Sequence, residues 1–149
     1  MSFVFTNFKR ALAEGEIDLV NDDIRAVLVM TDTTFDGAGD EDNDRMDDTT
    51  TEDYCDGANH DSTLGHALAT QAVNQDDPSN RAEFDAIDLV FTALGVGTRQ
   101  NQALVIFKWV TVIADSIPIA YIDSGGFNFD GNGGNVTFQW NAQGILQVT

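Results

Sequence analysis

Eleven of the 26 residues from 36 to 61 are Asp or Glu, and they are the side chains best suited to chemistry in this sequence. Carboxylate oxygens are the ligands that Ca²⁺ prefers, and a helix–loop–helix calcium site takes them from positions 1, 3 and 5 of its loop. Asp40, Asp42 and Asp44 have that spacing. They are therefore the candidate metal ligands of the chain.

The rest of the segment departs from the calcium-loop pattern. Arg45 stands at the position of the glycine that makes the sharp turn, and Thr51 stands at the position of the bidentate glutamate. We therefore favour a solvated, exposed loop over 36–61, ordered only by a partner, a cation or the packing of Met46 and Tyr54. Loose binding of divalent cations is the alternative.

A second group that could bind a metal is the pair His60 and His66, with Cys55 nearby. Zinc needs three or four ligands that converge on the ion, and this spacing matches neither a helical pair nor a familiar zinc signature. We interpret the two histidines as surface residues of a polar segment. Because the sequence has one cysteine, an internal disulfide is excluded.

Other sequence patterns that would support catalysis also fail. The glycine-rich stretch 125–134 is not followed by Lys-Ser or Lys-Thr and precedes a strand pattern, so it is not a phosphate loop. Asp85 and Asp88 would face opposite sides of a strand and could not share a proton. The sequence contains no Gly-x-Ser-x-Gly motif. We therefore expect a protein that is not an enzyme and has no cofactor.

The charge of the chain limits its partners. Its 149 residues include 25 Asp and Glu but 7 Lys and Arg, a formal net charge of −18. Nucleic-acid binding requires basic side chains that neutralise phosphates, and docking on an anionic membrane requires a basic patch. We expect neither partner. The first residues lack a signal-peptide pattern and no apolar run has the length of a membrane span, so we expect no export signal and no span.

The elements that must position these residues are mostly strands. Short apolar or alternating runs separated by Gly- and Asn-rich turns are typical of strands. They occur at 24–31, 83–91, 103–112, 117–123, 135–140 and 145–148. Weaker helical spacing occurs at 5–14, which Gly15 would end, and at 64–73, which could equally form a strand. The sequence therefore predicts a mainly β fold: a single β-sandwich or barrel-like domain over 1–149, with the long acidic surface loop at 36–61 and at most short helices.

The core is expected where large apolar side chains fall within those strands. The predicted core residues are Val27, Leu28, Val29, Phe84, Leu104, Ile106, Trp109, Ile119, Tyr121, Phe138 and Trp140. The run 103–112 is apolar on both faces, so it is either the central strand of a sandwich or has one face covered by another subunit. Late in the sequence, five apolar residues form a candidate self-association patch: Val136, Phe138, Trp140, Ile145 and Leu146.

Three blocks of the sequence carry a resemblance to a known group of proteins. They are 15–31, with Ile-Arg-Ala-Val-Leu-Val; 81–95 with 103–108; and 118–123, 126–127, 132–141 and 144–146, with Asn-Val-Thr-Phe-Gln-Trp-Asn. Together these blocks resemble small virion structural proteins of tailed bacteriophages. The acidic segment has no counterpart in that resemblance.

The resemblance implies a structural protein and brings no catalytic residues. Among positions in a virion we favour the capsid exterior, where a cement (decoration) protein stabilises contacts between major capsid subunits and has no need to touch DNA, which would repel this chain. The implied partners are the major capsid protein and further copies of the chain, in a homotrimer. The alternatives are a tail- or neck-associated structural protein, and a calcium-dependent binding module that uses the acidic loop.

Overall fold

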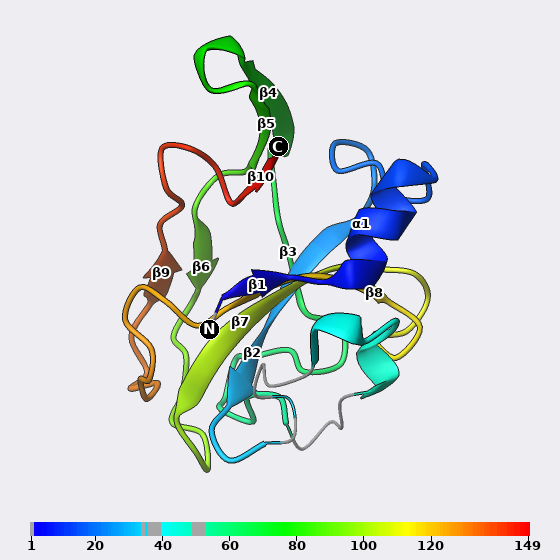
Figure 1. Ribbon diagram of the computed structural model, residues 1–149. Coiled ribbons are helices and arrows are strands. Elements are labelled where there is room, and N and C mark those ends of the chain that lie inside the picture. The colour runs from blue at the N-terminus through cyan, green and yellow to red at the C-terminus, as the bar shows by residue number, and fades with distance from the viewer. Residues whose placement is uncertain (1, 34, 36–39, 49–52) are drawn as a thin grey trace.

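The computed structural model describes residues 2–33, 35, 40–48 and 53–149 (Figure 1). The fold is mainly β, as predicted, and its antiparallel sheets resemble a small β-sandwich. The largest sheet has five strands in the order β1-β8-β7-β2-β3. Their bounds are Phe3–Val4 for β1, Ile24–Met30 for β2, His66–Ala67 for β3, Asn101–Lys108 for β7 and Ile117–Ile122 for β8.

The central strand β7 accounts for the most apolar run of the sequence. It pairs with β2 on one side and β8 on the other, and residues 103–107 are all 0% exposed. One chain therefore covers both faces of this strand, which is the first of the two alternatives left open above. The strand ends at Lys108 rather than at Val112, because the residues that follow leave the sheet and Val110 is exposed.

Two smaller antiparallel sheets lie beside the large one, in the orders β10-β5-β4 and β6-β9. Their strands are β4 Ala72–Asp76, β5 Arg81–Asp85, β6 Leu89–Phe91, β9 Val136–Phe138 and β10 Leu146–Val148. The β4–β5 hairpin, closed by the 3-10 turn η3 Asp77–Ser79, projects away from the large sheet (Figure 1). The single strand predicted at 83–91 is thus two strands that belong to different sheets.

Helix α1, Thr6–Ala13, confirms the helix predicted at 5–14. It packs against β8 with Phe8 and Ala11 buried, and Gly15 ends it in the left-handed conformation at φ +74°. The ambiguous segment 64–73 contains β3 and the start of β4. Within the described ranges, no helix has the length and apolar character needed to cross a bilayer.

Part of the acidic segment is packed into the body of the protein. Its described residues include two 3-10 turns, η1 Asp40–Asp42 and η2 Met46–Asp48. Its buried side chains are Met46, Asp53, Tyr54 and Cys55, which are 1–5% exposed. The prediction of a surface loop is corrected at Met46 and at residues 53–55, which are buried, and the packing of Met46 and Tyr54 is the ordering device that the sequence offered. Positions 36–39 and 49–52 of that prediction lie outside the described residues.

The core contains eight of the eleven residues predicted for it. Those with 0–2% exposure are Val27, Leu28, Val29, Phe84, Leu104, Ile106, Ile119 and Tyr121. Trp109, Phe138 and Trp140 are only partly buried, so their assignment to the core is corrected. Trp109 follows the end of β7, where the Arg25 guanidinium lies 4.2 Å from its ring centroid. The other two rings border a surface hollow.

Candidate functional site

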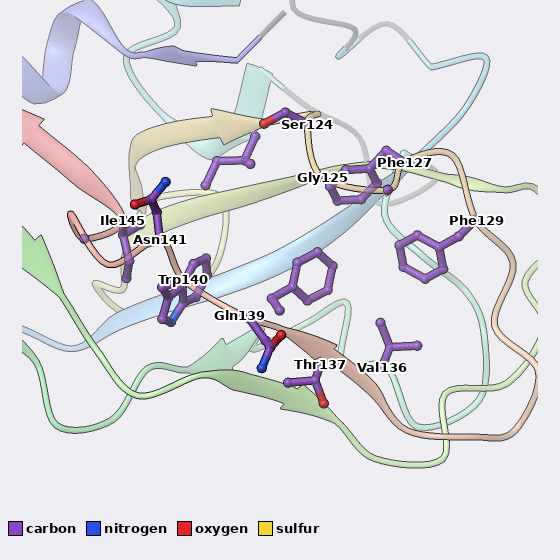
Figure 2. A pocket seen from close by; sticks show the side chains of 14 residues that line it. Ser124, Gly125, Phe127, Phe129, Val136, Thr137, Gln139, Trp140, Asn141 and Ile145 are labelled. Atoms are coloured by element: carbon purple, nitrogen blue, oxygen red, sulfur yellow. The ribbon is translucent and has the colours of Figure 1, made fainter.

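A hollow of about 680 Å³ lies between the loop at 124–129 and strand β9 (Figure 2). The loop forms one side, and β9 with the residues that follow it forms the other. The lining residues are Ile122, Ser124, Gly125, Gly126, Phe127, Phe129, Val136, Thr137, Phe138, Gln139, Trp140, Asn141, Gly144 and Ile145. One continuous stretch of chain therefore builds the hollow by folding back on itself.

Aromatic rings form the centre of the hollow. The ring centroids of Phe127 and Phe129 lie 5.6 Å apart, and Phe138 lies 5.7 Å from the first and 6.2 Å from the second. Phe91 of β6 supports this group from beneath, with its centroid 5.6 Å from that of Phe138. Such spacings are favourable for aromatic pairs. Alternation along β9 places Val136 beside Phe138 and leaves the residue between them exposed.

Two hydrogen bonds fix Trp140 at one end of the hollow. Its indole Nε1 donates to the carbonyl of Ile87 at 3.0 Å, and its backbone N–H donates to the Asp88 carboxylate at 3.1 Å. The Asp85 carboxylate instead accepts from the backbone N–H of Ala86 at 2.9 Å. The two aspartates thus have separate structural roles, and the indole is held in place before any partner arrives.

The lining of the hollow carries no charged side chain among its described residues. None of its fourteen described lining residues is Asp, Glu, Lys, Arg, His or Cys, so the lining holds neither a general base nor a strong nucleophile. Seven of the fourteen are apolar or aromatic, three are glycines, and four carry hydroxyl or amide groups: Ser124, Thr137, Gln139 and Asn141. A lining of this kind suits apolar groups of a partner.

The hollow includes most of the predicted self-association patch. Val136, Phe138, Trp140 and Ile145 line it. Leu146 does not, because it is 6% exposed and lies opposite Phe84 in the register of β10 and β5.

Two aromatic residues of the hollow were missed in the sequence. Phe127 and Phe129 lie within the glycine-rich stretch 125–134, for which the sequence analysis predicts no binding role. Their spacing of two residues, which places side chains on one side of an extended chain, was the available signal. Both are partly buried and pack against the core.

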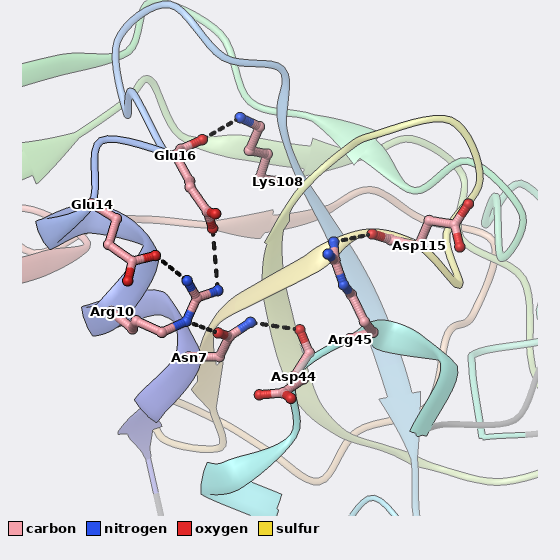
Figure 3. Close-up of polar contacts among 8 residues, drawn as sticks. All are labelled: Asn7, Arg10, Glu14, Glu16, Asp44, Arg45, Lys108 and Asp115. Carbon is pink, nitrogen blue, oxygen red and sulfur yellow. Dashed lines mark hydrogen bonds and ion pairs between the residues drawn. The ribbon is translucent and has the colours of Figure 1, made fainter.

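The candidate metal ligands do not form a site in the described part of the chain. Asp40 and Asp42 lie in η1, and the backbone carbonyl of Asp44 accepts a hydrogen bond from Asn7 Nδ2 at 2.7 Å (Figure 3). Among the residues described, no three or more His, Cys, Asp or Glu side chains are grouped to hold an ion.

The residues around Asp44 instead fasten the acidic segment to the body. Arg45 Nη1 donates to the carbonyl of Asp115 at 2.8 Å, and Asn7 also accepts from Arg10 Nε at 2.9 Å (Figure 3). The acceptors in these bonds are two backbone carbonyls and a side-chain amide oxygen. The segment is therefore attached by directed polar contacts on the α1 side.

The two histidines are partly buried, because their rings pack against the core residue Phe91, and their interpretation as surface residues of a polar segment is corrected accordingly. Their ring centroids lie 5.4 Å apart, and both rings contact Phe91. His60 Nε2 accepts from the backbone N–H of Leu28 at 3.0 Å, and His66 Nε2 accepts from that of Asp61 at 3.1 Å. Because these lone pairs are occupied, neither Nε2 is available to a metal.

Burial also sets the protonation of this pair. Burial first, and then the neighbouring His66, lower the pKa of His60 from 6.5 to about 4. Burial likewise lowers the pKa of His66, and it raises the pKa of the Cys55 thiol. Both histidines are therefore neutral at pH 7.

Known proteins provide no template for these features. No protein-family model, no curated protein and no solved structure matches the chain. The hollow is the candidate site because it is concave, aromatic and uncharged within a chain of net charge −18.

Proposed function

We propose that the chain is a non-enzymatic structural protein of a tailed-bacteriophage virion, a cement protein that binds the outside of the capsid. The observation that carries the proposal is the uncharged aromatic hollow, most of which belongs to the third block of the resemblance. The other two blocks contribute β2, β5, β6 and most of β7. The resemblance therefore covers both the sheet framework and the surface that the proposal uses.

The use of the basic side chains supports a location away from DNA. Six of the seven Lys and Arg bond to oxygen atoms of their own chain: Arg10, Arg25, Arg45, Arg81, Arg99 and Lys108. A protein that follows a phosphate backbone needs basic groups that are free to neutralise it. With 25 carboxylates in addition, repulsion from DNA is the expected behaviour.

The hollow gives the proposal a mode of assembly. Partly exposed aromatic side chains that are already held in place are effective anchors at protein interfaces. We assign the hollow to contacts between copies, which close into a homotrimer, and the polar surface to the major capsid protein. Closed cyclic assembly covers an apolar surface on every copy without leaving a free end.

The test combines sedimentation of the purified protein with cryo-electron microscopy of capsids to which it has been added. We expect a trimer in solution and density on the capsid exterior. Phe127→Ser should yield monomers, since it removes an anchor of the hollow. Val96→Ser is the matched control, because Val96 is 69% exposed and lies outside the hollow.

Each outcome of this test has a definite meaning. A monomeric wild-type protein that leaves the capsid bare would end the cement proposal. Density confined to the neck or tail would favour the tail- or neck-associated alternative. Equal loss of trimer in both variants would show that the hollow is not the contact between copies.

A further inference from the structure

The outer edge of β2 is completed by a side chain. Strand β2 pairs with β7 along one edge. The opposite edge, called the outer edge here, pairs with β3 only at the first residues of β2. Farther along β2, the outer edge forms hydrogen bonds with residues 53–55. The Met30 N–H donates to the Asp53 carbonyl at 2.8 Å, and the Cys55 N–H donates to the Leu28 carbonyl at 2.9 Å. Between these two pairings, the Leu28 N–H donates to His60 Nε2 at 3.0 Å. The imidazole thus replaces the carbonyl of a neighbouring strand.

This hydrogen bond defines the tautomer of His60. A nitrogen that accepts from a backbone N–H must carry a lone pair, so the ring proton is on Nδ1 and the ring is neutral. The same argument applies to His66, which accepts from the Asp61 N–H. Two neutral rings therefore lie side by side against Phe91, and each depends on remaining unprotonated at Nε2.

Few charges surround the pair. Asp61 is the carboxylate whose charge acts on both rings, where it opposes the lowering of their pKa values, and its Oδ1 accepts from the backbone N–H groups of Thr63 and Leu64. On β2 the nearest charged side chain is Arg25, which is paired with Asp23 at 2.6 Å.

The other neighbours of the pair are uncharged at pH 7. They are the buried Cys55 thiol and, from β6, the apolar ring of Phe91. Two described groups favour protonated His60, the backbone of Cys55 and the Asp61 carboxylate, and Asp61 also favours protonated His66.

We propose that His60 is an acid-sensitive latch, whose protonation expels its ring from the edge of β2 and leaves the Leu28 N–H open to pairing with another strand or with water. Protonation at Nε2 converts the acceptor into a donor that faces a second donor, so the hydrogen bond cannot survive. Protonation of both rings adds repulsion between two cations whose centroids lie 5.4 Å apart. The proposal does not depend on the proposed function, because it rests on the hydrogen bond between His60 and β2 and on no contact between copies, although Phe91 packs against both the histidines and Phe138 of the hollow.

Nuclear magnetic resonance of the whole protein tests the latch directly. We expect the ¹⁵N shifts of His60 to report the Nδ1–H tautomer at pH 7, and the ring to titrate with a midpoint near pH 4. The Leu28 amide resonance should shift with the same midpoint. The proposal would be overturned by any of three results: a His60 ring protonated on Nε2 at pH 7, a titration midpoint near 6.5, or a Leu28 amide resonance that does not shift as His60 titrates.

Hydrogen exchange measures the opening itself. After correction for the intrinsic pH dependence of exchange, protection of the Leu28 amide should fall about 100-fold between pH 7 and pH 4. His60→Gln is the matched variant, because its amide oxygen accepts the same N–H and does not titrate; the fall should disappear. A fall of equal size in the variant would show that other groups open this edge. Should the variant fail to fold, the wild-type titration remains decisive.

The variant His66→Gln separates the contribution of His66 from that of His60. Removing the neighbouring charge should raise the midpoint of His60 while keeping the coupling to the Leu28 amide. An unchanged midpoint would show that the histidines do not interact, and the latch would then reduce to His60 alone.

Discussion

Strands β7 and β9 are both rich in apolar residues, yet they end in different environments. β7 lies between β2 and β8, and residues 103–107 have no exposed surface. β9 pairs with β6 alone, and Val136 and Phe138 remain partly exposed beside the hollow. An apolar strand pattern thus indicates that the faces of the strand must be covered. The number of neighbouring elements decides whether the same chain provides that cover.

This difference between the two strands is tested most directly by replacing one phenylalanine with alanine in each of them. Phe107→Ala should lower the free energy of unfolding by about 3–5 kcal/mol, because it removes a fully buried ring from a packed core. Phe138→Ala should cost about 1–2 kcal/mol, because solvent already reaches part of that ring. Denaturant unfolding of the two variants measures both values. Equal losses would mean that the hollow is as well packed as the central sheet.

The next effect concerns pH. The pKa of His60 in the folded state, about 4, lies below its unfolded value of 6.5, so the unfolded chain binds more protons between these values. Stability from neutral His60 is complete above pH 6.5 and is lost as the pH falls toward 4, by roughly 3 kcal/mol in total. Unfolding measured across this range in wild type and His60→Gln isolates the contribution. Parallel curves for the two proteins would refute it.

A smaller effect is expected at the end of the hollow. Trp140→Ala should cost about 1–2 kcal/mol, since it removes a partly buried indole and its hydrogen bond to Ile87. Trp140→Phe keeps most of the packing and should cost about 1 kcal/mol through the lost hydrogen bond. Thermal unfolding can rank the two variants. A cost as large as that of Phe107→Ala would place this residue in the core, as the sequence alone suggested.

The smallest effect is expected at the surface of α1. Arg10 forms ion pairs with Glu14 and Glu16, and all three side chains are about half exposed (Figure 3). Exposed pairs of this kind contribute little, because water and salt screen them. Arg10→Ala should leave the melting temperature unchanged within error at 0.15 M salt. A clear drop would mean that the link through Asn7 to Asp44 depends on this arginine.

The strands that were predicted correctly could be located in the sequence because their local residue pattern is sufficient. The β-branched run at 24–31 and the apolar run that begins at 103 are informative without knowledge of neighbours, because side-chain alternation and propensity act over a few residues. The end of β7 was placed too late, since Val110 and Val112 are as apolar as the residues before them but leave the sheet.

The remaining features depend on contacts distant in the sequence. Residues 53–55 lie in a segment rich in carboxylates, yet they pair with β2 because that edge is unoccupied beyond β3. The hollow requires the stretch around Phe127 to fold back over β9, which no local pattern specifies. Four residues of the predicted patch line the hollow, and they could be named from the sequence because they lie in or beside strand runs.

The engagement of nearly all basic side chains within the chain has a consequence for assembly kinetics. Two approaching copies present fields of the same sign, with few free cations to offset them. The distance over which such fields act is about 30 Å at 0.01 M salt and about 8 Å at 0.15 M. In the proposed assembly, the apolar contact at the hollow acts only at close range, so dissolved ions must first shorten the range of the repulsion between copies. Encounter should therefore accelerate with ionic strength, the opposite of the behaviour of a protein steered toward DNA.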